Sequence, residues 1–154
     1  MSTTDQLFQV LNQSGTDELS AFLKAYEAKL LPESKAFATY MRLLLDSKGL
    51  KRQDIFVASD IPERYGYKLL SEEKHTKKRD IILRLCIASG FTLQETQRAL
   101  EIYGMARLYP RSPRDSVFIL AINNRINDVH EVDDLLGKHG FENLARCGMD
   151  GDLD

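Results

Sequence analysis

The sequence lacks several features that would place it in a common class of protein. Its 154 residues include no apolar run that approaches the roughly 18 residues needed to cross a membrane, and no signal peptide opens the chain. Cysteine occurs only at Cys86 and Cys147, which do not form a C-x-x-C pair. This cysteine content suits a reducing compartment, so we expect a cytoplasmic protein that does not bind membranes.

The sequence also lacks the usual patterns for catalysis and metal binding. Its three histidines, His75, His130 and His139, show no metal-ligand spacing with Cys or Glu. No Ser–His–acid arrangement and no glycine-rich phosphate loop is present. Residues 150–154 have the Asp-x-Asp-x-Asp opening of a calcium loop but not its later glutamate. We therefore expect no enzyme, no cofactor and no metal site.

Charge is distributed unevenly along a chain whose formal net charge is −2. Residues 35–79 contain eleven Lys or Arg and six Asp or Glu, whereas the remainder contains ten Lys or Arg and seventeen Asp or Glu. A basic block within an acidic chain is typical of a surface that contacts phosphates. The alternative is a solvated face on which charges cluster by chance, and charge alone does not separate the two.

Apolar residues recur at helical spacing in almost every segment, and no segment alternates as a strand would, so we expect an all-α protein. Capping boxes at Asp60–Glu63 and Thr92–Glu95 mark two of the helix starts, and glycines mark several of the ends. Thr76 and Asn127 are expected to cap two further helices. The expected helices cover about residues 16–30, 32–47, 51–59, 61–71, 76–89, 92–103, 112–124 and 127–138.

The most specific signal lies in residues 49–70, which read GLKRQDIFVASDIPERYGYKLL. This segment predicts two short helices joined by a tight turn, and the first of them would bury Leu50, Ile55 and either Val57 or Ala58. The second helix opens with Glu-Arg-Tyr-Gly-Tyr-Lys. A short helix that buries one face and presents Arg, Tyr and Lys on the other can lie in the major groove of DNA.

The order of five helices from about residue 35 to 104 resembles the lambda-repressor-like, or Xre-family, helix-turn-helix domain. In that family a Gly-Leu pair precedes the first motif helix, as at Gly49-Leu50, and apolar residues follow at positions matched by Ile55 and Ile61. A later Gly-apolar-Thr-apolar-x-Glu segment is similar to residues 90–95. The resemblance implies a five-helix DNA-binding domain that acts as a dimer on a two-fold operator.

The chain departs from the family pattern at five positions. Where the family favours a small residue in the first motif helix, this chain has Phe56, which bears on how closely the two helices can cross. Asp60 replaces the turn glycine, and Asp tolerates such a turn. The other departures replace a capping Ser or Thr, a favoured Gln and a polar residue, and they are Lys51, Arg52 and Pro62.

We expect DNA contacts from the second motif helix and from two basic groups that flank it as backbone clamps. For Tyr65 the alternative is packing in the core, and for Arg64 it is pairing with a nearby acid. The second basic group lies at residues 74–79 and also includes His75 and Arg79. The alternative for that group is a solvated loop. The expected DNA-binding residues are Lys51, Arg52, Glu63, Arg64, Tyr65, Tyr67, Lys68, Lys74, Lys77 and Lys78.

The functional expectation is a cytoplasmic, sequence-specific DNA-binding transcriptional regulator. The alternative is an all-helical protein-interaction adaptor that keeps the fold without operator binding. We divide the chain into an N-terminal helical extension (1–34), the helix-turn-helix domain (35–106), a C-terminal helical pair (107–144) and a disordered acidic tail (145–154). The apolar faces of the C-terminal pair must pack on the domain or on another subunit, so we expect a homodimer or a protein partner there.

Overall fold

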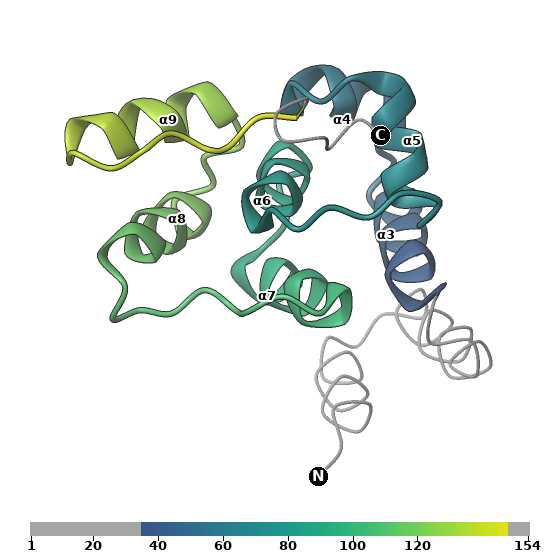
Figure 1. The fold of residues 1–154 in the computed structure, drawn as a ribbon, viewed down its shortest axis with the longest axis horizontal. Helices are drawn as coiled ribbons and strands as arrows, with labels where there is room; N and C mark the ends of the chain where they lie inside the picture. Colours follow the sequence, from purple (N-terminus) through teal and green to yellow (C-terminus); the bar gives the residue numbers. More distant parts are fainter. Residues whose placement is uncertain (1–34, 148–154) are drawn as a thin grey trace, which may run out of the picture.

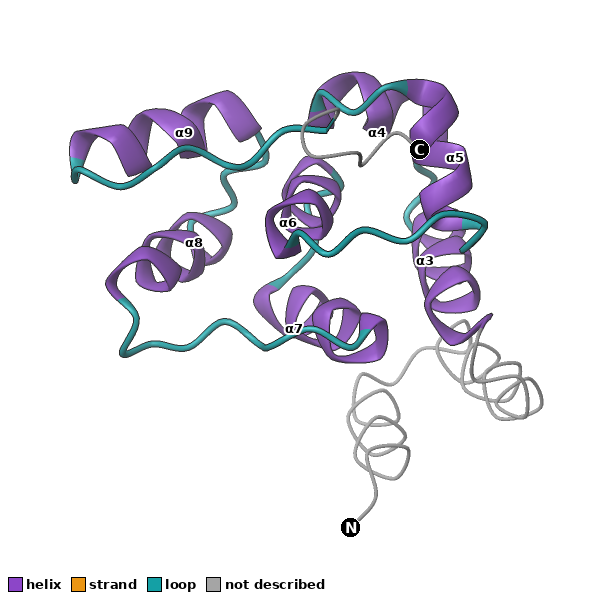
Figure 2. Cartoon of the chain, in the orientation of Figure 1, coloured by secondary structure: helices purple, strands orange, loops and turns teal. Residues whose placement is uncertain are grey.

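The structure is a computed structural model that describes residues 35–147. Within this range the protein is entirely helical, with seven helices and no strand, as expected (Figure 2). The expected helix over 16–30 and residues 148–154 of the expected tail lie outside the described residues. The helices are α3 (Ala36–Ser47), α4 (Arg52–Ser59), α5 (Glu63–Leu70), α6 (Arg79–Ala88), α7 (Leu93–Tyr103), α8 (Pro113–Asn123) and α9 (Val129–Lys138).

The helix ends follow the signals in the sequence more closely than the helix starts do. From α4 to α9 the expected C-terminal ends agree within one residue, whereas α5, α6 and α9 begin two or three residues later than expected. The capping box of α7 is confirmed, because the Thr92 hydroxyl accepts from the Glu95 N–H at 3.1 Å and the Thr92 N–H donates to the Glu95 carboxylate at 2.9 Å. The cap expected at Asn127 is instead Asp128, which accepts from the His130 N–H. The capping box expected at Asp60 does not form.

Asp60 ends α4 instead of starting α5. Its backbone is left-handed, with φ 60° and ψ 41°, which is the conformation that the family glycine would supply. Pro62 is the residue before α5, and no side chain caps that helix. The carboxylate of Asp60 pairs with Arg146 at 2.6 Å, so a partner distant in sequence takes it away from the capping role.

The helix α6 lies in the middle of the molecule, between α4, α7 and α9 (Figure 1). It can occupy this place because every residue from Ile81 to Ile87 is buried. The helices α3 and α5 pack on one side of the molecule, and α8 and α9 pack on the other. A single apolar core joins both sides, from Phe37 to Leu144. No helix in the described range is long and apolar enough to span a membrane.

The crossing of α4 and α5 is built around an unusual pair. Phe56 is 1% exposed, and a β-carbon placed on Gly66 would lie only 2.4 Å from its ring. The bulk of the Phe56 ring is therefore accommodated by a glycine on the facing helix. The expectation that Val57 or Ala58 faces inward is wrong, since both are exposed and Ser59 is buried instead. The inward stripe of α4 is Ile55, Phe56 and Ser59.

The C-terminal helices pack on the same chain. Their apolar faces are buried through Phe118, Ala121 and Ile122 of α8 and through Val129, Val132 and Leu136 of α9. Packing on the same chain was the alternative to packing on a second subunit. Because the apolar faces are covered in this way, they no longer give a reason to expect a dimer. The homodimer itself stays a prediction.

Reciprocal ion pairs fasten the start of α8 to the start of α6. Arg79 pairs with Asp115, and Arg114 pairs with Asp80 at 2.8 Å. Burial raises the pKa of Asp80, but the hydrogen bonds from Arg114 and from the Ala145 N–H outweigh it, so the pKa of Asp80 lies below its ordinary value. The same hydrogen bond to Asp80 raises the pKa of Arg114. Both starts are therefore held by charge-assisted bonds.

A C-terminal strap, residues 142–146, runs back along α6. Arg84 of α6 is 1% exposed and donates to three backbone carbonyls, those of Leu144 and Ala145 at 2.8 Å and that of Ser59 at 3.2 Å. Burial lowers the pKa of its guanidinium. The expected disordered tail was therefore placed too early at residue 145, because residues 145 and 146 are hydrogen-bonded to the body of the protein.

Candidate nucleic-acid interface

The helix α5 has one buried face and one exposed face. Tyr65, Gly66, Leu69 and Leu70 are buried, at the i, i+1, i+4 and i+5 spacing of a helix that packs along one side. The opposite face presents the expected contact residues: Glu63, Arg64 and Tyr67 are exposed, and Lys68 is half-buried. Four of the five residues expected on this helix are therefore accessible to a ligand.

The exception is Tyr65, which is only 4% exposed. Its assignment to the exposed side of the helix is corrected, and the alternative of core packing is what the structure shows. The physical reason is the register of α5: Tyr65 precedes Leu69 by four residues, so both lie on the stripe that meets the core.

Arg64 is the most available cation on α5. Within residues 35–147 its guanidinium forms no hydrogen bond and no ion pair, so the alternative in which it pairs with a nearby acid is not observed there. Tyr67 is 44% exposed, and its ring packs edge-on against Phe56 with the centroids 4.9 Å apart. That contact holds the phenol at the surface beside the start of α4.

The first flanking group lies at the start of α4. Lys51 is the N-cap residue and is exposed, and no side chain caps this helix end. Arg52 is half-buried, and its guanidinium lies 4.0 Å from the Asp46 carboxylate, beyond hydrogen-bond distance. The free N–H groups and the two cations together make this end of α4 attractive to an anion.

The structure brings Arg52 and Tyr67 together in one cavity. It has a volume of about 330 Å³, and its walls also include Lys35 and Arg42, neither of which was expected as a contact residue. Lys35 and Arg42 were missed because they lie outside the two motif helices. Their seven-residue spacing, which puts both on one face of α3, was the signal that could have found them.

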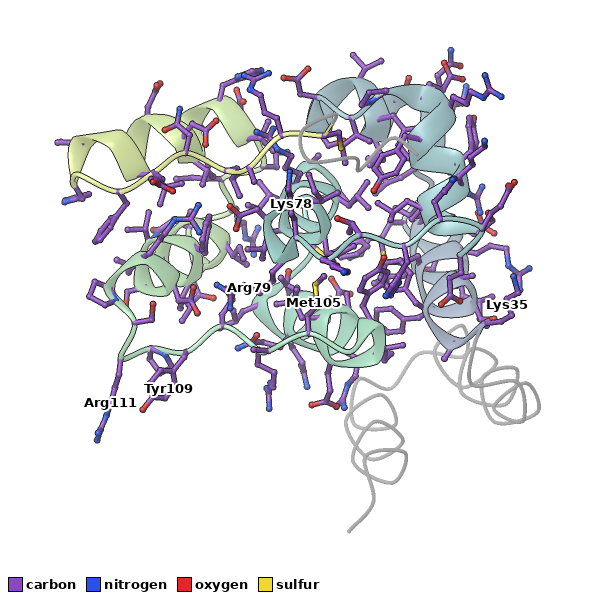
Figure 3. The ribbon with its side chains drawn as sticks, in the orientation of Figure 1. Lys35, Lys78, Arg79, Met105, Tyr109 and Arg111 are labelled. Atoms are coloured by element: carbon purple, nitrogen blue, oxygen red, sulfur yellow. The ribbon has the colours of Figure 1, made fainter. Side chains whose placement is uncertain are left out.

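The second flanking group lies on the loop between α5 and α6, and the structure divides it. Lys77 is exposed, Lys74 and Lys78 are half-buried, and Arg79 is committed to Asp115. Figure 3 shows Lys78 and Arg79 near the start of α6, well separated from Lys35. The structure therefore places the last two members of this group at the start of α6, away from Lys35.

The loop itself is held in place by aromatic contacts. The ring of His75 stacks on Tyr103 with the centroids 4.2 Å apart, and the Tyr103 hydroxyl accepts from the Thr76 N–H at 2.8 Å. Thr76 in turn accepts from the Lys78 N–H, so it shapes the loop and does not cap α6 directly. The lysines thus project from a backbone of defined conformation.

Comparison of the chain with protein-family models, with curated proteins and with solved structures found no match.

Among residues 35–147, no group of three or more His, Cys, Asp or Glu side chains is placed to hold a metal ion. Cys86 is fully buried, and burial raises the pKa of its thiol far above the ordinary value. Its thiol therefore lacks the exposed, ionised character of a reactive cysteine.

Proposed function

We propose that this protein is a sequence-specific DNA-binding transcriptional regulator of the helix-turn-helix type, acting in the cytoplasm. In this proposal α4 and α5 form the motif and α5 enters the major groove. The observation that carries the proposal is the exposed face of α5, where Arg64 stands without a partner among the described residues. An arginine in that state is free to contact a guanine edge with two hydrogen bonds.

Three further features support the proposal. The turn between α4 and α5 uses a left-handed residue, Asp60, at the place of the family glycine. Tyr67 and Lys68 lie within one helical turn of Arg64, where they can reach backbone phosphates. Lys51 and Arg52 stand at the open N-terminal end of α4, and a phosphate there would accept from the free N–H groups.

A protein-interaction adaptor is the second candidate function. It is favoured by Val57, which is 78% exposed on the outer side of α4, next to the proposed DNA surface. A large aliphatic side chain in that place suits a protein partner better than it suits a phosphate backbone. Leu120 on α8 is also 63% exposed and would serve a partner or a second subunit of the proposed homodimer.

The experiment that tests the proposal is selection of binding sites from random DNA duplexes, followed by titration of the preferred site. We expect Arg64→Ala to weaken binding to that site by about 1–3 kcal/mol and to relax the choice of base at one position. The matched control is Arg111→Ala, because Arg111 is also exposed but projects from the connection before α8 (Figure 3).

Two outcomes would count against this proposal. If preferred and random DNA lose affinity equally in Arg64→Ala, Arg64 does not read a base. If selection enriches no sequence and the protein shows no salt-dependent binding to any duplex, the adaptor becomes the better account. Light scattering with and without the selected DNA tests the homodimer separately.

A further inference from the structure

The cavity between α3, α4 and α5 collects positive charge from three segments of the chain. Lys35 precedes α3, Arg42 lies two turns further along that helix, and Arg52 is the first residue of α4. Tyr67 of α5 forms part of the opposite wall. None of the residues that line the cavity carries a negative charge. Three cations therefore border a cavity of about 330 Å³. The carboxylates beside its walls are those of Asp46, near Arg52, and of Glu72, which accepts from the Ala38 N–H at 3.2 Å.

The described residues neutralise these cations only weakly. Lys35 donates to the carbonyl of Ser71 at 3.1 Å, a neutral acceptor. Arg52 lies 4.0 Å from Asp46, beyond hydrogen-bond distance. Arg42 is exposed and forms no hydrogen bond or ion pair with any of the residues from 35 to 147. Like charges held close together oppose folding, and a bound anion would offset that cost.

The chemistry of the walls selects among anions. Guanidinium groups bind phosphate with paired hydrogen bonds, and a lysine adds a compact positive charge. Three cations suit an anion with several charged oxygens better than a single carboxylate. The volume lies at the lower end of the range for ligand pockets, which fits a phosphate together with an attached sugar or ring. Tyr67 offers a phenol and part of a ring face to that attached group.

We infer that this cavity binds a phosphate group. One source of the phosphate is the backbone of bound DNA, and in that form the inference rests on the proposed function. Arg52 and Tyr67 belong both to the cavity and to the proposed DNA surface, so the cavity extends that surface onto α3. The other source is a free phosphorylated small molecule, which would compete with DNA for the same two side chains.

The first experiment titrates the full chain with inorganic phosphate and with adenosine monophosphate, using sodium chloride at matched ionic strength as the reference. Amide resonances in residues 35–42, 52 and 67–71 are expected to shift and saturate with either phosphate probe but not with chloride. Arg42→Ala is expected to weaken that binding about tenfold, the loss expected for one charge-assisted hydrogen bond. Arg111→Ala should leave the binding unchanged.

The second experiment measures DNA affinity against salt concentration for the same variants. If the phosphate comes from DNA, Arg42→Ala flattens the logarithmic salt dependence by about one unit, and Arg111→Ala does not. If the phosphate comes from a small molecule, the salt slope stays the same while the titrated shifts are still lost. Thermal unfolding of each variant shows that the fold is retained.

The inference and the proposed function fail in different ways. The inference fails alone if the protein binds selected DNA but two results are negative. The cavity resonances would respond to chloride as they do to phosphate, and Arg42→Ala would leave the salt dependence of DNA binding unchanged. Saturable phosphate binding in the cavity of a protein that binds no DNA would overturn the proposed function and keep the inference, with a free ligand as its source.

Discussion

Two groups of arginines in this protein have opposite surroundings. On the side built from α6, α8 and α9, Arg79 and Arg114 pair with carboxylates and Arg84 is bound by three carbonyls. On the side built from α3, α4 and α5, Arg42 and Arg64 are exposed, and neither has a partner within the described range. A guanidinium that is satisfied internally holds the fold, whereas one that is left open is available to a ligand.

The difference teaches how to separate structural from functional charge in a chain where both occur close together in sequence. In the sequence, Arg79 and Arg64 both belong to the basic segment of residues 35–79, and their charge alone does not distinguish them. The structure separates them, because Arg79 faces the start of α8 and Arg64 faces outward. The contrast predicts that substitution of the paired arginines changes the free energy of unfolding and that substitution of the open arginines changes binding.

The largest effect is expected from Arg84→Met. This change leaves the carbonyls of Ser59, Leu144 and Ala145 buried without their donor, so we expect a loss of about 4 kcal/mol in the free energy of unfolding. Urea unfolding measures it, and faster hydrogen exchange at the Leu144 and Ala145 amides would show release of the strap. A variant within 0.5 kcal/mol of the parent would contradict the structural role of Arg84.

The next largest effect is expected from Gly66→Ala. The added methyl group would lie 2.4 Å from the ring of Phe56, and relief requires the two helices to separate, so we expect a loss of about 2–3 kcal/mol. Gly137→Ala is the control, because nothing lies within 4 Å of its added β-carbon, and it should stabilise α9 by about 0.5–1 kcal/mol. Equal effects at the two glycines would show that Phe56 does not set the crossing.

A double-mutant cycle makes the same point independently. Phe56→Ala alone should cost about 3–5 kcal/mol through the cavity that it leaves. Adding Gly66→Ala to it should cost less than Gly66→Ala does in the parent, because the ring that causes the clash is gone. Strict additivity of the two losses would refute the direct contact.

A smaller effect, which depends on pH, is expected from Asp80→Asn. The pKa of Asp80 is lowered in the folded protein, so its stabilisation is present above the ordinary value of 3.8 and is lost as the pH falls through the folded value. At pH 7 the variant should lose about 1.5 kcal/mol, and its stability should depend less on pH under acidic conditions. Asp134→Asn, an exposed change on α9, is the control. If the stability of Asp80→Asn fell with decreasing pH as steeply as that of the parent, the lowered pKa of Asp80 would be contradicted.

The smallest effect on folding is expected at the open arginines. Arg42→Ala and Arg64→Ala should each change the free energy of unfolding by less than about 0.5 kcal/mol, because neither guanidinium forms a hydrogen bond or an ion pair with residues 35–147. Removal of the guanidinium, which is expected to cost about 4 kcal/mol at Arg84, should therefore have almost no effect on stability at these two positions. A loss above about 1 kcal/mol at either position would show that this arginine stabilises the fold, as Arg84 does.

The sequence supports prediction of the helices much better than prediction of the contacts between them. Glycines and capping residues act over one helical turn, which is why the C-terminal ends of α4 to α9 and the Thr92 capping box were predicted correctly. Asp60 fits a local capping pattern, but its carboxylate pairs with Arg146, which is 86 residues away, and does not cap α5. No local signal carries information about such a partner.

The candidate site divides in the same way. The exposure of Arg64 and Tyr67 follows from the period of a single helix, so the sequence sufficed to predict it. The fit of Phe56 against Gly66 depends on two helices at once and could not be read from either. The cavity with Lys35 and Arg42 depends on three segments, and it became visible only when the packing of α3 on the motif was known.

The strap that Arg84 holds has a consequence for how the protein is made. The acceptors of Arg84 lie at Ser59 on one side and at Leu144 and Ala145 on the other, 60 and 61 residues beyond it. During synthesis α3 to α6 leave the ribosome before those last acceptors exist. The guanidinium of Arg84 can therefore reach the Ser59 carbonyl early, but it gains its other two acceptors only after translation has passed residue 145.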